Sequence, residues 1–578
     1  MSSSVVWIVG SAWPYVNYVP HLGNMIGSIL SADVFVRYLR LKGENVIFVS
    51  GSDVHGTPIE VEARKLGIDP HEYAEIMHKI VTDLLKKWNI SYDNYTSTES
   101  KVHINFVQKF FMKLYERGLI FEKEDTLPYC PRDRIFLPDR FIVGTCPYCG
   151  YESARGDQCE KCGSLLEPTQ LVNPRCAICG STPEWRKTRH WYLDLKKLEE
   201  DVKKYVESND KLPENVKTMS ISILKSGLKP RSVTRDNKWG IPAPFPGAEG
   251  KTIYVWFEAV LGYISATMEY FERKFGNPDR GLELWKNPNT RVVFFIGKDN
   301  IPFHSIILPA LLIGSGDGYV LPYTISATEY LMYEGKKFSK SQKVGIWIDE
   351  ALRIFDNVDY WRFILIYIRP ETKDSNFSWD VAIDIVNSII NDTIGNFIHR
   401  VLTLVKRRLG GKTPSITKLE ECDKKIINEA LKVVEDVDKL YSNIKLRDAL
   451  HRAVDIARIG NKYFNERRPW DLLKSDYELG SSVLGVGLHL VKMLAICLYP
   501  VMPSSMEKLW NLIGYRCSIL ERGWNDVVNP VDPGLEIGEV SPLFRKISRD
   551  EISMRLKELE QDRAVRWSRK YPWEQVAI

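Results

Sequence analysis

The chain has 578 residues, of which 44% are hydrophobic, so it is long enough for several domains with a core in each. Its 79 basic and 74 acidic residues leave a net charge of +5, and only local basic stretches such as HRVLTLVKRRLGGK can therefore indicate a nucleic-acid partner. No apolar run long enough to span a bilayer stands out, and MSSS leads directly into a strand-like segment, which together predict a cytoplasmic protein with no membrane association.

The segment Ser11–Gly23 (SAWPYVNYVPHLG) has the surroundings that a nucleotide site requires. The apolar run Val5–Val9 before it is predicted to be a strand of a parallel sheet. Apolar residues recur at helical spacing after it up to Lys42, so a helix is expected to begin near His21. The free N–H groups and positive dipole end at such a helix N-terminus favour phosphate, and His21 adds a donor. An ordinary strand-to-helix turn is the alternative.

A lysine-rich segment far along the chain has a second feature of a phosphate site. In GKKFSKSQKVG (335–345), Lys337 and Lys340 flank Ser339, and glycines bound the segment. Such a loop can close over phosphates, because lysine ammonium groups bind phosphate oxygens. A lysine-rich loop that is merely solvated is the alternative.

Taken together, HLGN (21–24) and KFSKS (337–341) resemble the HIGH and KMSKS signatures of class I aminoacyl-tRNA synthetases. Asn24 stands in place of the second histidine and Phe338 in place of the methionine. The motifs AWPYVN, GSDVHGTP, YVWFEAVLGY, GKDN and FHSIILPA extend the resemblance over nearly the whole chain. They narrow it to methionyl-tRNA synthetases, and the cysteines described below resemble those of the archaeal-type members with zinc knuckles.

The resemblance implies an enzyme that uses ATP and Mg²⁺ to activate L-methionine as methionyl-adenylate. It also implies transfer of the methionine to the 3′-terminal adenosine of tRNA(Met), initiator tRNA included. Catalysis is assigned to His21, Asn24, Lys337 and Lys340, and ATP binding to His21, Gly23, Asn24, Gly297, Asp299, Lys337, Ser339 and Lys340. Another class I synthetase is the nearest alternative. A nucleotidylyltransferase with an HxGH motif and a non-catalytic RNA-binding paralogue are two further alternatives. A long helical C-terminal part disfavours the first, and the presence of His21 and both lysines disfavours the second.

Acidic residues follow two predicted strands, at the edge where doubly wound sheets bind ligands. Asp53 comes after the strand Val46–Val49 and can bind an ammonium group or cap the next helix. Asp299 comes after the strand Val292–Ile296 and can bind a ribose hydroxyl or cap a helix. The resemblance assigns Asp53 to the α-amino group of methionine.

The aromatic segment TIYVWFEAVLGYISA (252–266) is predicted to be a strand of the sheet that runs into a helix. Aromatic residues at this spacing usually form plain core. By resemblance, the methionine side chain is instead surrounded by Ala12, Trp13, Tyr15, Trp256, Ala259, Val260, Tyr263 and His304. Aromatic edges and a single polar donor suit a flexible thioether.

Seven of the ten cysteines lie between Cys130 and Cys179, and six of these form C-x-x-C pairs. In a cytosolic protein this clustering indicates zinc rather than disulfides. Cys146, Cys149, Cys159 and Cys162 form a closed set of four thiolates, as in structural zinc sites. Cys130, Asp133, Cys176 and Cys179 flank it and are expected to form a second zinc site. Three free thiols beside a solvated Asp133 are the alternative there.

The predicted fold is an α/β, Rossmann-like doubly wound parallel sheet with a zinc-knuckle insertion and a C-terminal α-helical bundle. The insertion is too short for a large editing domain, so selectivity must come from the synthetic pocket. The C-terminal tail is expected to be one amphipathic helix folded back on the body, and the absence of an appended dimerisation domain predicts a monomer. The expected divisions are 1–119 and 247–325 for the sheet domain, 120–246 for the insertion, 326–382 for the lysine loop and a connector that contacts the tRNA stem, 383–547 for the bundle and 548–578 for the tail.

Asn396 and Arg400 lie four residues apart and therefore on one face of a predicted helix, where they can contact the edges of unstacked bases. Trp470 offers a stacking surface with Arg467 and Arg468 beside it. A packed tryptophan and a solvated arginine are the alternative. By resemblance, Asn396, Arg400 and Trp470 read the CAU anticodon of tRNA(Met).

Overall fold

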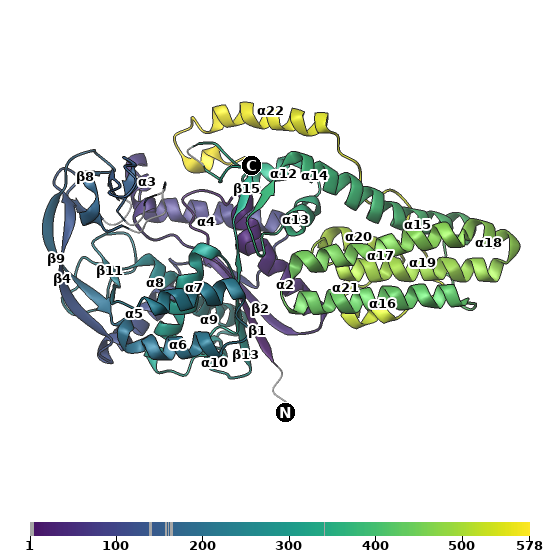
Figure 1. Cartoon of the computed structure of the whole chain (residues 1–578), viewed down its shortest axis with the longest axis horizontal. Coiled ribbons are helices and arrows are strands. Elements are labelled where there is room, and N and C mark those ends of the chain that lie inside the picture. The colour runs from purple at the N-terminus through teal and green to yellow at the C-terminus, as the bar shows by residue number, and fades with distance from the viewer. Residues whose placement is uncertain are drawn as a thin grey trace.

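The computed structural model describes residues 5–137, 141–156, 159, 161, 166–339 and 342–577. A parallel sheet in the order β14-β13-β1-β2-β3 forms the centre of the N-terminal part (Figure 1). Its strands are β1 (Val6–Ser11), β2 (Asn45–Ser52), β3 (Asn94–Ser97), β13 (Thr290–Gly297) and β14 (Thr324–Thr328). β1 pairs in parallel with both β2 and β13, which is the doubly wound order expected from the sequence.

Both faces of the sheet are covered by helices. Trp7 and Val9 of β1 belong to one core cluster and Ile8 to the other, because alternate side chains of a strand point to opposite faces. The first cluster includes residues of α2 (Leu30–Leu41) and α4 (Pro70–Lys87), and the second includes residues of α5 (Lys101–Glu116), α9 (Gly262–Phe275) and α11 (Leu308–Ser315). Between β2 and α4, the chain forms one further helix, α3 (Thr57–Leu66). This burial on both faces explains why β1 has an unbroken apolar sequence.

The prediction that 252–266 starts as a strand of this sheet is wrong. Only Thr252–Ile253 (β12) is extended, and it pairs with β11 (Thr234–Arg235), outside the parallel sheet. The rest forms α8 (Val255–Ala259) and α9. Phe257, Leu261 and Ile264 recur at intervals of three and four and enter one core cluster, so helical periodicity overrides the strand preference of the aromatic residues.

An insertion lies at one end of the molecule, on the left in Figure 1. Its frame is a long antiparallel pair, β4 (Ile120–Cys130) and β9 (Glu184–Leu193), with β5 (Ile135–Phe136) and β10 (Arg231–Ser232) at the edges. The cysteines lie on and around a second small sheet of β6 (Ile142–Thr145), β7 (Ala154–Arg155) and β8 (Val172–Cys176). Cys130, Cys146, Cys159 and Cys176 are buried in the small core between them.

A helical bundle forms the opposite end of the molecule (Figure 1). Its helices are α15 (Asn396–Arg408), α16 (Glu421–Ser442), α17 (Leu446–Arg467), α18 (Pro469–Ser475), α19 (Tyr477–Leu498) and α20 (Pro503–Leu512). Contrary to the expectation from sequence, α19 is long and apolar enough to cross a membrane, the one such helix in the described part of the chain. Since 94% of its most apolar stretch is buried, we assign it as the central helix of the bundle.

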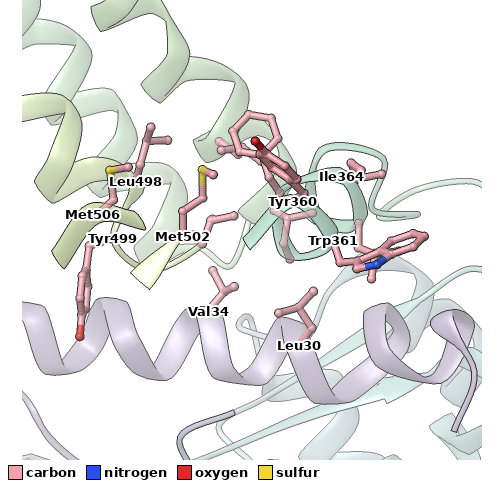
Figure 2. Close-up of a cluster of buried hydrophobic side chains, with 14 of the residues drawn as sticks. Leu30, Val34, Tyr360, Trp361, Ile364, Leu498, Tyr499, Met502 and Met506 are labelled. Carbon is pink, nitrogen blue, oxygen red and sulfur yellow. The ribbon is translucent and has the colours of Figure 1, made fainter. Parts of the chain in front are cut away.

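The bundle packs directly against α2 of the sheet domain. Figure 2 shows Leu30 and Val34 of α2 facing Tyr360 and Trp361 of α13 (Val358–Tyr367) and the turn after α19, where Met502 lies. Buried charges cross the same contact. Asp33 of α2 accepts from Arg37 at 2.8 Å and from Arg362 of α13 at 2.7 Å, and Arg362 also donates to the carbonyls of Pro500 and Val501 at 3.1 and 2.8 Å. Burial alone would raise the pKa of Asp33, but the two guanidinium charges lower it below its usual range.

The tail is not one helix. α22 (Arg549–Arg566) is followed by a separate short 3-10 helix, Pro572–Gln575. α22 packs on the body along its length. Ile552 and Leu559 are buried in the core, and Arg555 donates to the carbonyl of Ile354. Near the end of the helix, Arg563 donates to Glu350 at 2.7 Å and to the carbonyl of Gly345 at 2.7 Å. The expected return of the tail to the body is therefore correct, and both apolar side chains and buried arginines make the contact.

We predict that Arg362→Met lowers the free energy of unfolding by about 3 to 5 kcal/mol, because Asp33 loses a buried cationic partner. Urea titration followed by circular dichroism measures the change. The matched control is Arg452→Met, since Arg452 is 37% exposed and its partners Asp436 and Asp455 lie on the surface. That variant should change the free energy by about 1 kcal/mol or less. Equal effects of the two variants would contradict a structural role for the buried charges.

Candidate functional site

His21 begins the helix that follows β1, as expected from the sequence. Its Nδ1 accepts from the backbone N–H of Asn24 at 3.3 Å, and Asn24 Oδ1 accepts from the backbone N–H of His21 at 3.1 Å. Because Nδ1 is an acceptor, the ring proton lies on Nε2. Burial lowers the pKa of His21 to about 4, so the imidazole is neutral and presents one N–H donor. Gly23 lies beside this ring, and a Cβ there would be 3.0 Å from it.

The lysine-rich segment contacts this helix start. The ring of Phe338 stacks on His21 with centroids 4.4 Å apart and planes at 10°. Ser339 and Val344 exchange backbone hydrogen bonds of 2.9 Å, which folds the segment back on itself. Lys340 and Ser341 lie outside the described residues. The two motifs recognised in the sequence therefore meet through the residue that differs from the usual methionine.

A second polar group lies at the carboxyl ends of β13 and β14. Gly297 ends β13, and Asp299 follows it. Asp299 accepts a hydrogen bond from the hydroxyl of Tyr330, whose ring has Lys298 Nζ 4.0 Å and Lys337 Nζ 5.4 Å from its centroid. Gly297, not Asp299, is the N-cap of the short helix that follows, so the capping alternative for Asp299 is wrong. Our sequence reasoning missed Tyr330, although its place just after β14 was a usable signal.

A group of aromatic side chains lies next to the carboxyl end of β1. Trp13 and Tyr263 meet edge to face with centroids 6.4 Å apart, and the Tyr263 hydroxyl lies 2.9 Å from His304 Nε2. His304 Nδ1 lies 3.0 Å from the Asn300 carbonyl and can only donate to it, so Nε2 accepts from Tyr263 in the neutral ring. Burial lowers the pKa of His304 to about 4, which supports this assignment. Gly262 makes the packing possible, because a Cβ there would be 2.6 Å from the Trp13 ring.

The remaining predicted pocket residues lie around this group. Trp256, on α8, is 38% exposed and packs on Phe303 with ring centroids 4.7 Å apart. Ala259 ends α8, and Val260 after it is buried. Tyr15 pairs with Asp53 through the backbone and accepts from the N–H of Ile59 at 3.1 Å, and Ala12 donates its N–H to the Phe295 carbonyl at 2.9 Å.

Asp53 is 8% exposed at the end of β2. Gly56 is the N-cap of α3 and no side chain caps it, so the alternative that Asp53 caps this helix is wrong. Burial, and after it the charge of Glu258, raises the pKa of Asp53 well above its usual value. A buried carboxylate of this kind favours a cationic ligand.

The cysteines gather as two separate groups of potential metal ligands. In the outer group, Asp133 Oδ2 lies 3.1 Å from Cys130 Sγ and 3.2 Å from Cys176 Sγ, and Cys130 lies 3.5 Å from Cys179. In the inner group, Cys149 and Cys159 lie 3.6 Å apart with Cys146 beside them, while Cys162 lies outside the described residues. Sulfurs bound to one tetrahedral zinc at about 2.3 Å are about 3.8 Å apart, so both groups fit a zinc ion.

Two of the three predicted base-reading residues, Arg400 and Trp470, lie close together in the bundle. Arg400 Cζ lies 5.9 Å from the Trp470 ring centroid, and its guanidinium donates to Asn465 at 2.8 Å. Asn396 is exposed at the start of α15. Arg467 differs from the expectation, because ion pairs with Glu420 and Asp423 at 2.8 and 2.9 Å hold it against α16.

Family models match both the N-terminal and the C-terminal part of the chain. A family model described as tRNA synthetases class I (M) matches residues 7–402, and one described as the anticodon binding domain of methionyl tRNA ligase matches residues 413–561. The methionine–tRNA ligase of Pyrobaculum calidifontis is 58% identical over 572 residues, which cover 99% of this chain and 100% of the relative. That of Caldivirga maquilingensis is 60% identical over 576 residues, which cover 100% and 97%.

The fold is also that of a solved structure. Mycobacterium tuberculosis methionyl-tRNA synthetase in complex with methionyl-adenylate superposes with a TM-score of 0.77 at 22% identity, over 94% of this chain and 99% of that one. Together, the class I family model over more than half of the chain and the full-length identity to methionine–tRNA ligases show that the chain belongs to the methionyl-tRNA synthetase family of class I aminoacyl-tRNA synthetases.

Proposed function

We propose that this chain is a methionine–tRNA ligase, which activates L-methionine with ATP and transfers it to the 3′-terminal adenosine of tRNA(Met), initiator tRNA included. The observation that carries the proposal is the stack of Phe338 on His21, because it brings both signature segments to the sheet edge that also bears the aromatic pocket. A cytoplasmic location and a monomeric state are part of the proposal, and light scattering tests the second.

Adenylation needs no basic side chain in this site. The methionine carboxylate is ionised at neutral pH and can attack the α-phosphate of ATP directly, so the protein has to align the two and stabilise charge. Neutral His21 is suited to donate its Nε2–H to a phosphate oxygen, and Lys337 supplies positive charge from the opposite segment. Lys340 is assigned the same role from the motif alone. Mg²⁺ bound with ATP would neutralise the pyrophosphate oxygens.

The second step is an attack by a ribose hydroxyl of the tRNA on the mixed anhydride. The acyl group is already activated, so positioning again dominates. Asp299 is proposed to bind the ribose of ATP, and Asp53 the ammonium group of methionine. Trp13, Tyr263 and Trp256 are proposed to enclose the thioether side chain together with the other pocket residues described above.

The first test is ATP–pyrophosphate exchange with each of the twenty amino acids, in which only methionine should support rapid exchange. Lys337→Ala should then slow adenylate formation by about two to three orders of magnitude, the usual loss for one donor to transition-state charge. The matched control is Lys336→Ala, because Lys336 is an exposed neighbour that pairs with Tyr333 through its backbone. Adenylation at the wild-type rate in Lys337→Ala would contradict the assignment of the lysine segment to the phosphate site.

The two cysteine groups are proposed to bind one structural zinc ion each. Zinc would hold the small sheet β6–β8 on the long β4–β9 pair, since a closed four-ligand site contributes folding free energy directly. Metal analysis is expected to find two zinc ions per chain in the wild type. Cys146→Ser and Asp133→Ala should each retain only one. Cys517→Ser is the control and should retain both. An unchanged zinc content in both ligand variants would refute the sites.

The bundle is proposed to read the CAU anticodon through Asn396, Arg400 and Trp470. Stacking of a base on an aromatic side chain contributes about 1 to 3 kcal/mol. Trp470→Ala should therefore weaken tRNA aminoacylation about ten- to a hundredfold and leave pyrophosphate exchange unchanged. Tyr477→Ala is the matched control, because Tyr477 is an aromatic residue that is 60% exposed on the next helix. Equal losses of tRNA aminoacylation in the two variants would contradict a role of Trp470 in anticodon recognition.

A further inference from the structure

Two buried carboxylate oxygens near the amino-acid pocket are unpaired. Asp53 is 8% exposed and Glu258, on α8, is fully buried. Among the described residues, neither Asp53 Oδ1 nor Glu258 Oε2 has a hydrogen-bond partner. Burial of a carboxylate oxygen without a donor is unfavourable, so both oxygens indicate a donor that this part of the chain does not supply.

The two carboxylates belong to one charged cluster. His55, two residues after Asp53, lies 2.7 Å from Glu258 Oε1 through Nδ1 and 2.6 Å from Glu99 Oε1 through Nε2. Burial alone would lower the pKa of His55, but these carboxylates raise it to about 10, so the ring is an imidazolium that donates from both nitrogens. One imidazolium faces three carboxylates, and the cluster is therefore short of positive charge.

We propose that Glu258 is a second ligand of the methionine ammonium group, which binds between Asp53 Oδ1 and Glu258 Oε2. This inference rests on the proposed function, because it takes methionine as the occupant. A primary ammonium has three N–H donors and a full positive charge, and it satisfies both orphaned oxygens at once. Glu258 also lies on α8, the helix that carries Trp256 and Ala259 of the proposed methionine site.

Glu99 provides a matched comparison. It bonds the same histidine as Glu258 and carries the same charge, but its second oxygen lies 2.9 Å from His71 and its side chain is 25% exposed. A variant at Glu99 therefore perturbs His55 without removing an unpaired oxygen. A variant at Glu258 perturbs His55 and also removes an unpaired oxygen.

The experiment compares two ligands that differ in one group. L-Methionine carries the ammonium, and 2-hydroxy-4-(methylthio)butanoate has a hydroxyl in its place. Their affinities are measured by competition in pyrophosphate exchange for the wild type, Glu258→Gln and Glu99→Gln. We expect Glu258→Gln to lower the affinity for methionine by about tenfold or more, which is the usual effect of losing a charge-assisted hydrogen bond. The affinity for the hydroxy acid should fall by less than about twofold. Glu99→Gln should change the affinities for both ligands by the same factor.

An equal loss for both ligands in Glu258→Gln would overturn the inference, because Glu258 would then act only through His55. An unchanged methionine affinity would overturn it as well and would assign the orphaned oxygen to water. Failure of the wild type to use methionine at all would instead refute the proposed function, so the two failures are distinguishable.

A measurement on the wild type covers the case in which Glu258→Gln does not fold. Burial raises the pKa values of both carboxyl groups, and a cation bound between them would lower these values again, so ammonium binding is expected to release protons from the pair. Of the other titratable groups, His55 and Glu99 act directly on the pair, His71 bonds Glu99, and His103 feels the charge of His55. Calorimetry in two buffers of different ionisation enthalpy should show proton release with methionine and none with the hydroxy acid. Equal release with both ligands would overturn the inference.

Discussion

The contact between Asp33 and Arg362 joins the two halves of the molecule. Both side chains are fully buried, and their distance of 2.7 Å spans the boundary between α2 and α13. Charges of this kind tolerate little displacement, since removal of one partner leaves the other unpaired in a medium of low polarity. Arg362 also binds two carbonyls at the end of α19, so the central helix of the bundle is fixed to the helix that begins at His21. The proposed phosphate site and the bundle are thus joined through one set of buried contacts.

The two signature segments are held together by neighbours as well as by each other. The N–H of Leu22 donates to the Ile346 carbonyl at 3.1 Å and that of Ile348 to the Pro20 carbonyl at 3.0 Å, so the chain after the lysine loop runs beside His21. The tail covers this junction, where Tyr18 donates to the Gln575 carbonyl at 3.0 Å. The C-terminal tail therefore contacts the segment that leads into the helix start at His21.

Electrostatics divides the site into two parts. On the proposed phosphate side, burial keeps His21 neutral, and positive charge comes from lysines such as Lys298 and Lys337. On the proposed amino-acid side, carboxylates predominate, and the imidazolium of His55 lies between Glu258 and Glu99. The difference suits the chemistry, because the ammonium group keeps its charge throughout the reaction, whereas charge on the phosphates develops in the transition state.

The sequence alone determined the fold class, the two signature motifs and the cysteine groups, because these depend on local spacing and on residue types that have few other uses. It predicted β1, the helix start at His21 and most of the bundle helices for the same reason. It misassigned 252–266, where aromatic residues favour a strand but burial of Phe257, Leu261 and Ile264 on one face requires a helix. It also left open whether Asp53 and Asp299 cap helices. Only the tertiary structure decided these points and revealed Tyr330 and Glu258, because the partners of a buried polar group come from segments far apart in the chain.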